Sequence, residues 1–71
     1  MVKKNVDYRM RFEKDDNRNA VATVLKNGNV DANIYINNKN IELIRHFNSI
    51  DEAVIELGNM GYVNGVLESV Q

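Results

Sequence analysis

Apolar and polar residues alternate with a period of two along the first part of the chain. In residues 6–13 the apolar members fall on one side and charged residues occupy the other. Successive side chains of a β-strand point to opposite faces of a sheet, so this alternation predicts a half-buried strand. Turn-forming polar residues 14–19 follow, and β-branched residues within 20–26 predict a second strand. The apolar side of the first strand consists of Val6, Tyr8, Met10 and Phe12.

Asn27-Gly28 is the strongest turn signal in the chain. Both residue types tolerate a positive φ, as the two-residue loop of a type I′ hairpin requires. Such a loop pairs Leu25 with Val30, and paired residues share one face of the sheet. The resulting core face is apolar apart from one threonine hydroxyl. It consists of Val21, Thr23, Leu25, Val30, Ala32, Ile34 and Ile36.

A second two-residue loop is expected at Asn38-Lys39, followed by a fourth strand over residues 41–47. This register again matches apolar with apolar residues across the two strands. Arg45 falls on the core side, where we expect it at the rim. The pairs that this loop sets are Ile36 with Ile41 and Ile34 with Leu43.

Ser49 and Glu52 have the spacing of a helix capping box, in which the hydroxyl accepts from the amide at Glu52 and the carboxylate reaches back. A helical face follows, with apolar residues at i, i+3, i+4 and i+7. Gly58 and Gly61 bracket the predicted end of the helix, and with Gly65 they are interpreted as stop signals. The predicted buried face consists of Ile50, Ala53, Val54 and Leu57.

These elements predict an α+β fold in a single domain over residues 1–71. Its sheet is an antiparallel β-meander of three to four strands, followed by one short helix packed on one face. Residues 62–70 fit either a last C-terminal strand, antiparallel to the first strand and beside it, or a second helix. A chain of 71 residues buries only about 60% of the surface its unfolded form exposes, so self-association is one route to stability.

Composition narrows the classes of protein that the sequence allows. The absence of cysteine excludes disulfides and thiolate metal sites. No apolar run approaches the ~20 residues of a membrane span, and no signal pattern is present, so we expect a cytoplasmic protein without membrane contact. A bias towards Asn, Lys and Ile favours a bacterial or phage origin. Residues 1–45 carry a charge of +3 from nine basic and six acidic residues, whereas residues 46–71 carry −4.

The chain has little inventory for catalysis. His46 is the only histidine, and the nearby Ser49 is already explained as a helix cap. No spacing of carboxylates and histidine is typical of a metal site, and no glycine-rich loop follows a strand in a phosphate-binding arrangement. We therefore expect no enzymatic activity, no metal and no cofactor.

The predicted outer side of the sheet is the candidate interaction face, because it combines apolar, aromatic and basic residues. The C-terminal segment, a second copy of the chain or a partner could each cover it. The leading hypothesis is a non-enzymatic accessory protein that acts by protein–protein contact, as an inhibitor or a self-associating module in a homodimer. Nucleic-acid binding is the alternative. The candidate residues are Arg9, Arg11, Val24, Lys26, Tyr35, Ile44 and His46.

The segment Tyr8–Phe12 (YRMRF), a polar turn, further strands and the segment Phe47–Ala53 (FNSIDEA) resemble the arm-type DNA-binding domains of phage integrases. The resemblance implies a three-stranded sheet that enters the major groove, with a helix packed behind it. This chain departs from that family in its acidic balance, its fourth strand and the missing recombinase. Because acidic residues such as Asp31 interleave with the basic ones, nucleic acid ranks second.

Overall fold

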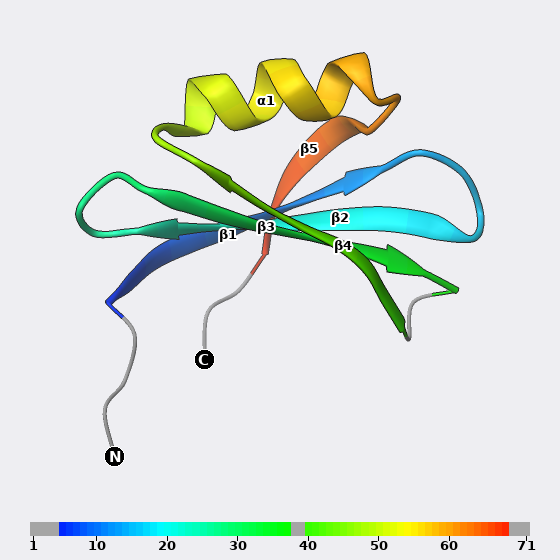
Figure 1. Cartoon of the computed structure of the whole chain (residues 1–71), viewed down its shortest axis with the longest axis horizontal. Coiled ribbons are helices and arrows are strands. Elements are labelled where there is room, and N and C mark those ends of the chain that lie inside the picture. Colours follow the sequence, from blue (N-terminus) through cyan, green and yellow to red (C-terminus); the bar gives the residue numbers. More distant parts are fainter. Residues whose placement is uncertain (1–4, 38–39, 69–71) are drawn as a thin grey trace.

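The computed structural model describes residues 5–37 and 40–68 (Figure 1). Five strands form one antiparallel sheet in the order β4-β3-β2-β1-β5, and α1 lies across one of its faces. Within the described residues, the other face carries no helix. The elements are β1 (Val6–Glu13), β2 (Arg18–Leu25), β3 (Val30–Ile36), β4 (Asn40–Phe47), α1 (Ile50–Asn59) and β5 (Val63–Glu68).

The predicted α+β class, with an antiparallel meander followed by one short helix, is confirmed. The alternative for residues 62–70 is decided in favour of a strand, because residues 63–68 form β5. As expected for that choice, β5 pairs antiparallel to β1, with Met10 opposite Leu67. The meander therefore gains a fifth strand from the far end of the sequence.

Small side chains occupy the middle of the sheet where α1 crosses it. Ala20, Ala22 and Ala32 are completely buried, and so are Ala53 and Leu57 of the helix. Alanine on both sides lets the helix approach the strands closely, and close packing of this kind is the normal state of a protein interior. The core is completed around this centre by Phe12, Val24, Val30, Ile34, Phe47 and Tyr62.

The hairpin between β2 and β3 differs from the predicted two-residue type I′ turn. The Gly28 N–H donates to the Leu25 carbonyl at 2.9 Å, and the Leu25 N–H donates to the Asn29 carbonyl at 2.8 Å. Gly28 has the expected positive φ of 95°, but Asn27 does not share it, since Asn37 and Asn64 are the only non-glycine residues with positive φ in the described ranges. The loop thus has three residues and a glycine bulge.

One extra loop residue shifts the register and exchanges the two faces of β2. Val24, not Leu25, lies opposite Val30, and Ala22 lies opposite Ala32. A one-residue slip moves every side chain of a strand to the other face. The predicted placement of Val21 on the core face is therefore wrong. The same correction applies to Thr23 and Leu25.

The pairing of β3 with β4 is partly as predicted. Ile34 lies opposite Leu43, which confirms that pair, but Ile36 lies opposite Asn40 and not Ile41. The register shifts between the two positions, because β4 contains one more residue there than β3 does. The proposed loop at residues 38–39 lies outside the described residues.

The helix begins with the predicted cap. The Ser49 hydroxyl accepts a hydrogen bond from the Glu52 N–H at 3.1 Å, and the Glu52 carboxylate reaches back to the Asn48 N–H at 3.0 Å. Ala53 and Leu57 form the buried face, whereas 43% of Val54 is exposed. The buried stripe is therefore narrower than predicted.

The predicted helix end is confirmed at Gly61, which has a φ of 95°. Its N–H donates to the Gly58 carbonyl at 3.0 Å, and the Tyr62 N–H donates to the Leu57 carbonyl at 2.8 Å. These two bonds form a Schellman motif, in which glycine supplies the left-handed residue. Tyr62 is consequently turned into the core, where only 4% of it is exposed.

Gly65 lies inside β5, so its interpretation as a stop signal is wrong. A Cβ atom at this position would come within 2.6 Å of the Phe12 Cε2 atom, closer than carbon atoms approach one another. The absent side chain lets the edge strand pass directly over the buried phenylalanine ring. Gly65 is thus a packing requirement of the β1–β5 pair.

We expect Gly65→Ala to lower the free energy of unfolding by about 1–3 kcal/mol, since overpacking a core contact has a cost of this order. Gly58→Ala is the matched control: its Cβ would meet nothing within 4 Å, and alanine is the better helix former by up to ~1 kcal/mol. Urea denaturation of both variants measures the two effects. Equal stabilities would contradict the contact between β5 and Phe12.

Candidate functional site

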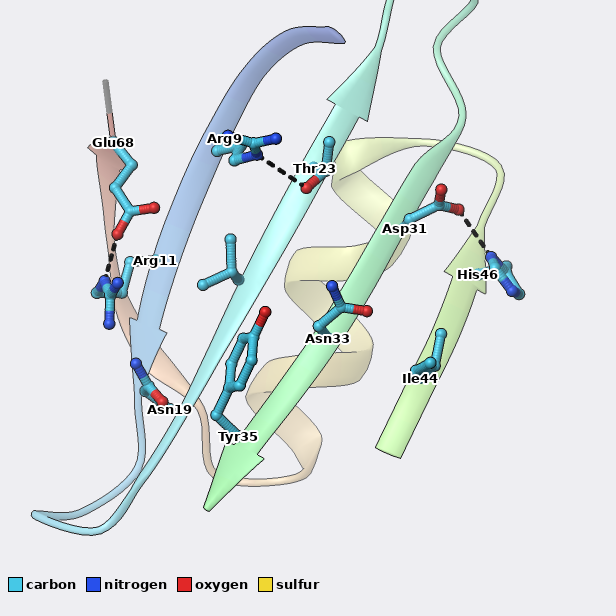
Figure 2. A pocket seen from close by; sticks show the side chains of 11 residues that line it. Arg9, Arg11, Asn19, Thr23, Asp31, Asn33, Tyr35, Ile44, His46 and Glu68 are labelled. Atoms are coloured by element: carbon cyan, nitrogen blue, oxygen red, sulfur yellow. Dashed lines mark hydrogen bonds and ion pairs between the residues drawn. The ribbon is translucent and has the colours of Figure 1, made fainter. Parts of the chain in front are cut away.

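The sheet face opposite α1 is hollowed along its central strand. Figure 2 looks onto this face, with the helix behind the sheet. The hollow has a volume of about 670 Å³ and is lined by side chains from all five strands. We call it the open-face groove and define it by three parts. The floor consists of Asn19, Val21 and Thr23; one wall of Arg9, Arg11 and Glu68; the other wall of Asp31, Asn33, Tyr35, Ile44 and His46.

The floor is covered by side chains of the strands on either side. Only 6% of Asn19 and 9% of Val21 are exposed, although α1 lies on the opposite face of the sheet. Val21 of β2 lies opposite Arg11 of β1 on one side and opposite Asn33 of β3 on the other. Longer side chains therefore rise along β1 and β3 and leave β2 as the bottom of the groove.

One wall of the open-face groove contains both of its arginines. The Arg11 guanidinium forms an ion pair with the Glu68 carboxylate, which ties β1 to β5. The Arg9 Nε donates to the Thr23 hydroxyl at 3.3 Å (Figure 2). Among the side chains that the structure describes, no carboxylate lies within ion-pair distance of Arg9. Arg9 thus carries the charge on this wall that lacks a described counter-ion.

The other wall contains a histidine–aspartate pair. The His46 Nδ1 and the Asp31 Oδ1 lie 2.7 Å apart, across the β3–β4 pair. The His46 side chain is 74% exposed, so water surrounds most of its ring. Beside it, 53% of Ile44 is exposed. This wall therefore offers the groove an apolar contact and a hydrogen-bonded pair close to solvent.

The charges that line the groove balance. When histidine is left out of the formal charge, Arg9 and Arg11 are offset by Asp31 and Glu68. A groove of zero formal charge produces no strong field, so it neither attracts nor repels a polyanion as a whole. Its recognition chemistry consists of individual groups at particular positions.

Asn19 has a hydrogen-bonding group without a partner. Its side-chain oxygen is buried and accepts no hydrogen bond from the part of the chain that the structure describes. An unsatisfied buried acceptor costs about 1–3 kcal/mol, so native proteins keep few of them. Tyr35 lies directly opposite Asn19 in the β2–β3 register and stands beside it in Figure 2. The floor of the groove therefore holds an unused acceptor.

Five of the seven residues predicted for the interaction face line the groove. These are Arg9, Arg11, Tyr35, Ile44 and His46. Lys26 lies in the hairpin loop and is exposed outside the groove. The predicted placement of Val24 on this face is wrong, because only 5% of the residue is exposed and it belongs to the core. The register shift of β2 is the physical reason for that error.

Sequence reasoning missed the floor of the groove. Val21 and Thr23 were expected on the core face, and Asn19 was assigned to a polar turn. The signal that finds them is the length of the hairpin loop, since a three-residue loop turns the odd-numbered positions of β2 away from the helix. That signal is ambiguous in the sequence, because Asn-Gly suits both loop lengths.

Comparisons with models of known protein families, with curated proteins and with solved structures gave no match. The resemblance to integrase arm-type domains therefore stays a prediction. Among residues 5–37 and 40–68, no group of three or more histidine and carboxylate side chains is arranged to hold a metal ion. No helix in the same ranges is long and apolar enough to cross a membrane.

We expect Asn19→Val to raise the free energy of unfolding by about 1 kcal/mol, because it removes a buried acceptor that has no donor. Most substitutions of buried residues have the opposite sign. Asn33→Val is the matched control: it makes the same change on the neighbouring strand, at a position with no unsatisfied buried atom. Chemical denaturation compares the two. A loss of stability in Asn19→Val alone would show that the amide is satisfied in solution.

Proposed function

We propose that the protein is a non-enzymatic binding protein whose open-face groove receives a protein partner. The observation that carries this proposal is the groove itself, which has unmet polar groups on a sheet face left bare by the fold. A buried acceptor without a donor lowers stability, and function is a common reason for such a cost. The proposal includes an accessory or inhibitory role in the cytoplasm of a bacterial or phage-infected cell.

A protein partner fits the groove better than nucleic acid does. Phosphate recognition requires an excess of positive charge, whereas the two arginines that line the groove are equalled in number by two carboxylates. Arg11 is already committed to Glu68. Tyrosine and arginine, which both line the groove, are instead enriched in surfaces that bind proteins. Nucleic-acid binding therefore remains the second candidate.

A second copy of the chain is a weaker candidate for the same groove. Homodimer formation was expected from an apolar cluster that included Val24, and that residue is in the core. Ile44 is the one large apolar side chain that both lines the groove and is highly exposed in the described structure. Stable self-packing requires a larger apolar centre than this. We therefore propose a partner of different sequence.

The proposal is tested by capture from a nuclease-treated lysate of the source organism, followed by quantitative mass spectrometry. We expect Ile44→Asp to reduce recovery of the partner at least tenfold, since it places a charge in the groove. Ile55→Asp is the matched control, because more than half of this isoleucine is exposed too, but it lies on α1. It should leave recovery unchanged. Both sites are at the surface, so neither substitution opens a cavity.

Two outcomes would contradict this assignment. If Ile55→Asp and Ile44→Asp reduced recovery equally, the contact surface would not be the groove. Sedimentation of the purified protein gives the other test, with the monomer expected at micromolar concentration. A dimer that Ile44→Asp dissociates would identify a second copy as the occupant.

For nucleic acid, we expect random-sequence DNA and RNA to bind no tighter than about 10⁻⁴ to 10⁻⁶ M at physiological salt, the range of weak non-specific binding. Fluorescence anisotropy at two salt concentrations measures this. Nanomolar binding that weakens with salt, and that is lost when Arg9 and Arg11 are both replaced by alanine, would overturn the ranking. The nucleic-acid candidate would then take first place.

A further inference from the structure

We infer that the open-face groove takes an extended acidic peptide segment, which places a carboxylate on the Arg9 guanidinium and a hydrogen-bond donor on the Asn19 amide. The inference rests on the proposed function and adds the chemistry of the partner. It follows from the two groups of the groove that the described chain leaves unmet.

Arg9 is the group that selects a carboxylate. Its Nε is held by the Thr23 hydroxyl, which fixes the direction of the guanidinium, while its terminal nitrogens have no acceptor among the described residues. Arg9 is also partly buried in the wall of the groove. A guanidinium presents a planar pair of donors that a carboxylate accepts in two parallel hydrogen bonds. The partner is therefore expected to supply an Asp or Glu side chain here.

Asn19 is the group that selects a donor. Its oxygen lies in a side chain that is 6% exposed and accepts nothing from the described chain. Only an N–H or O–H satisfies it. Tyr35 lies opposite Asn19, so its half-buried ring must turn aside as the donor enters. Rotation of a surface side chain is fast and does not limit binding.

The spacing of these two groups fits an extended peptide. Arg9 lies opposite Thr23, and Asn19 is four residues further along β2. At ~3.3 Å per residue, the two positions are about 13 Å apart, which four residues of an extended chain also span. Val21 lies between them on the floor, where a small apolar side chain of the peptide meets it. A compact anion cannot reach both groups at once.

The test uses nuclear magnetic resonance of the ¹⁵N-labelled protein with two defined probes. One is the capped peptide acetyl-Glu-Ala-Val-Ala-Ser-amide, and the other has Gln in place of Glu. We expect the acidic probe to move the amide signals of Asn19, Val21 and Thr23 and to bind at least fivefold tighter than the Gln probe. The affinity of such a short peptide is expected to be millimolar.

Two variants assign the contacts. Arg9→Gln should lower the affinity for the acidic probe to that for the Gln probe. Arg45→Gln should leave both affinities unchanged, because Arg45 is exposed on the helix side of β4. Asn19→Val should lower the affinity for the acidic probe, whose serine supplies the hydrogen-bond donor. It should not lower the affinity for a version of that probe with alanine in place of the serine. Since Asn19→Val is expected to be more stable than the parent, unfolding would not explain its loss of binding.

Equal binding of the two probes would overturn the acidic requirement, while still leaving a peptide groove. Inorganic phosphate or a random oligonucleotide that competes more tightly than the acidic probe, and depends on Arg9, would also overturn the inference. Failure of the proposed function looks different: partner capture would then be insensitive to Ile44→Asp. The two failures are thus separated by which experiment detects them.

Discussion

The three-residue loop between β2 and β3 is the constraint on which the rest of the structure depends. β2 is the central strand, so the face that each of its side chains takes decides both the core and the groove. With Gly28 at the bulge, the alanines of β2 point towards α1 and let the helix come close. The opposite register would place Thr23 under the helix and push it outward. Core packing and groove chemistry are therefore two results of a single loop length.

A sheet has two faces, and the described part of this chain supplies one helix to cover them. The open face stays in contact with solvent, and the fold protects its centre with long side chains instead. Ion pairs and hydrogen bonds between strands, such as Arg11 with Glu68, hold these side chains upright and leave β2 as a floor. The recess is thus a consequence of covering a sheet with side chains where a second layer is missing. Covering the sheet with side chains does not explain why the Arg9 guanidinium lacks a described counter-ion or why the Asn19 oxygen lacks a donor.

Much of the fold could be predicted from local patterns. The alternation along β1 placed Phe12 in the core, and the Ser49–Glu52 spacing located the helix start, because each depends on neighbours in sequence. The strand at residues 63–68 stayed undecided, since its role comes from pairing with β1. Local patterns therefore determined the elements more securely than their partners.

The candidate site was predicted in its walls but not in its floor. Arg9 and Tyr35 face the groove as the alternation of β1 and β3 indicated. For β2 the sequence gives no decision, because both of its faces carry β-branched or small residues and Asn-Gly fits two loop lengths. Packing of β2 against α1 selects one of the two registers, and this packing depends on the tertiary structure and not on the local sequence. Asn19 was consequently invisible as a buried acceptor until the register was known.

The pairing of the last strand with the first also has a consequence for how the chain folds. β1 to β4 follow one another in the sheet, so their contacts close short loops, whereas Arg11 and Glu68 are 57 positions apart. Closing a long loop costs more chain entropy, so we expect the meander to form first and β5 to join it late. Contacts made late hold the native state mainly by slowing its unfolding. We therefore expect the contacts between β5 and β1 to influence the unfolding rate of the protein more than its folding rate.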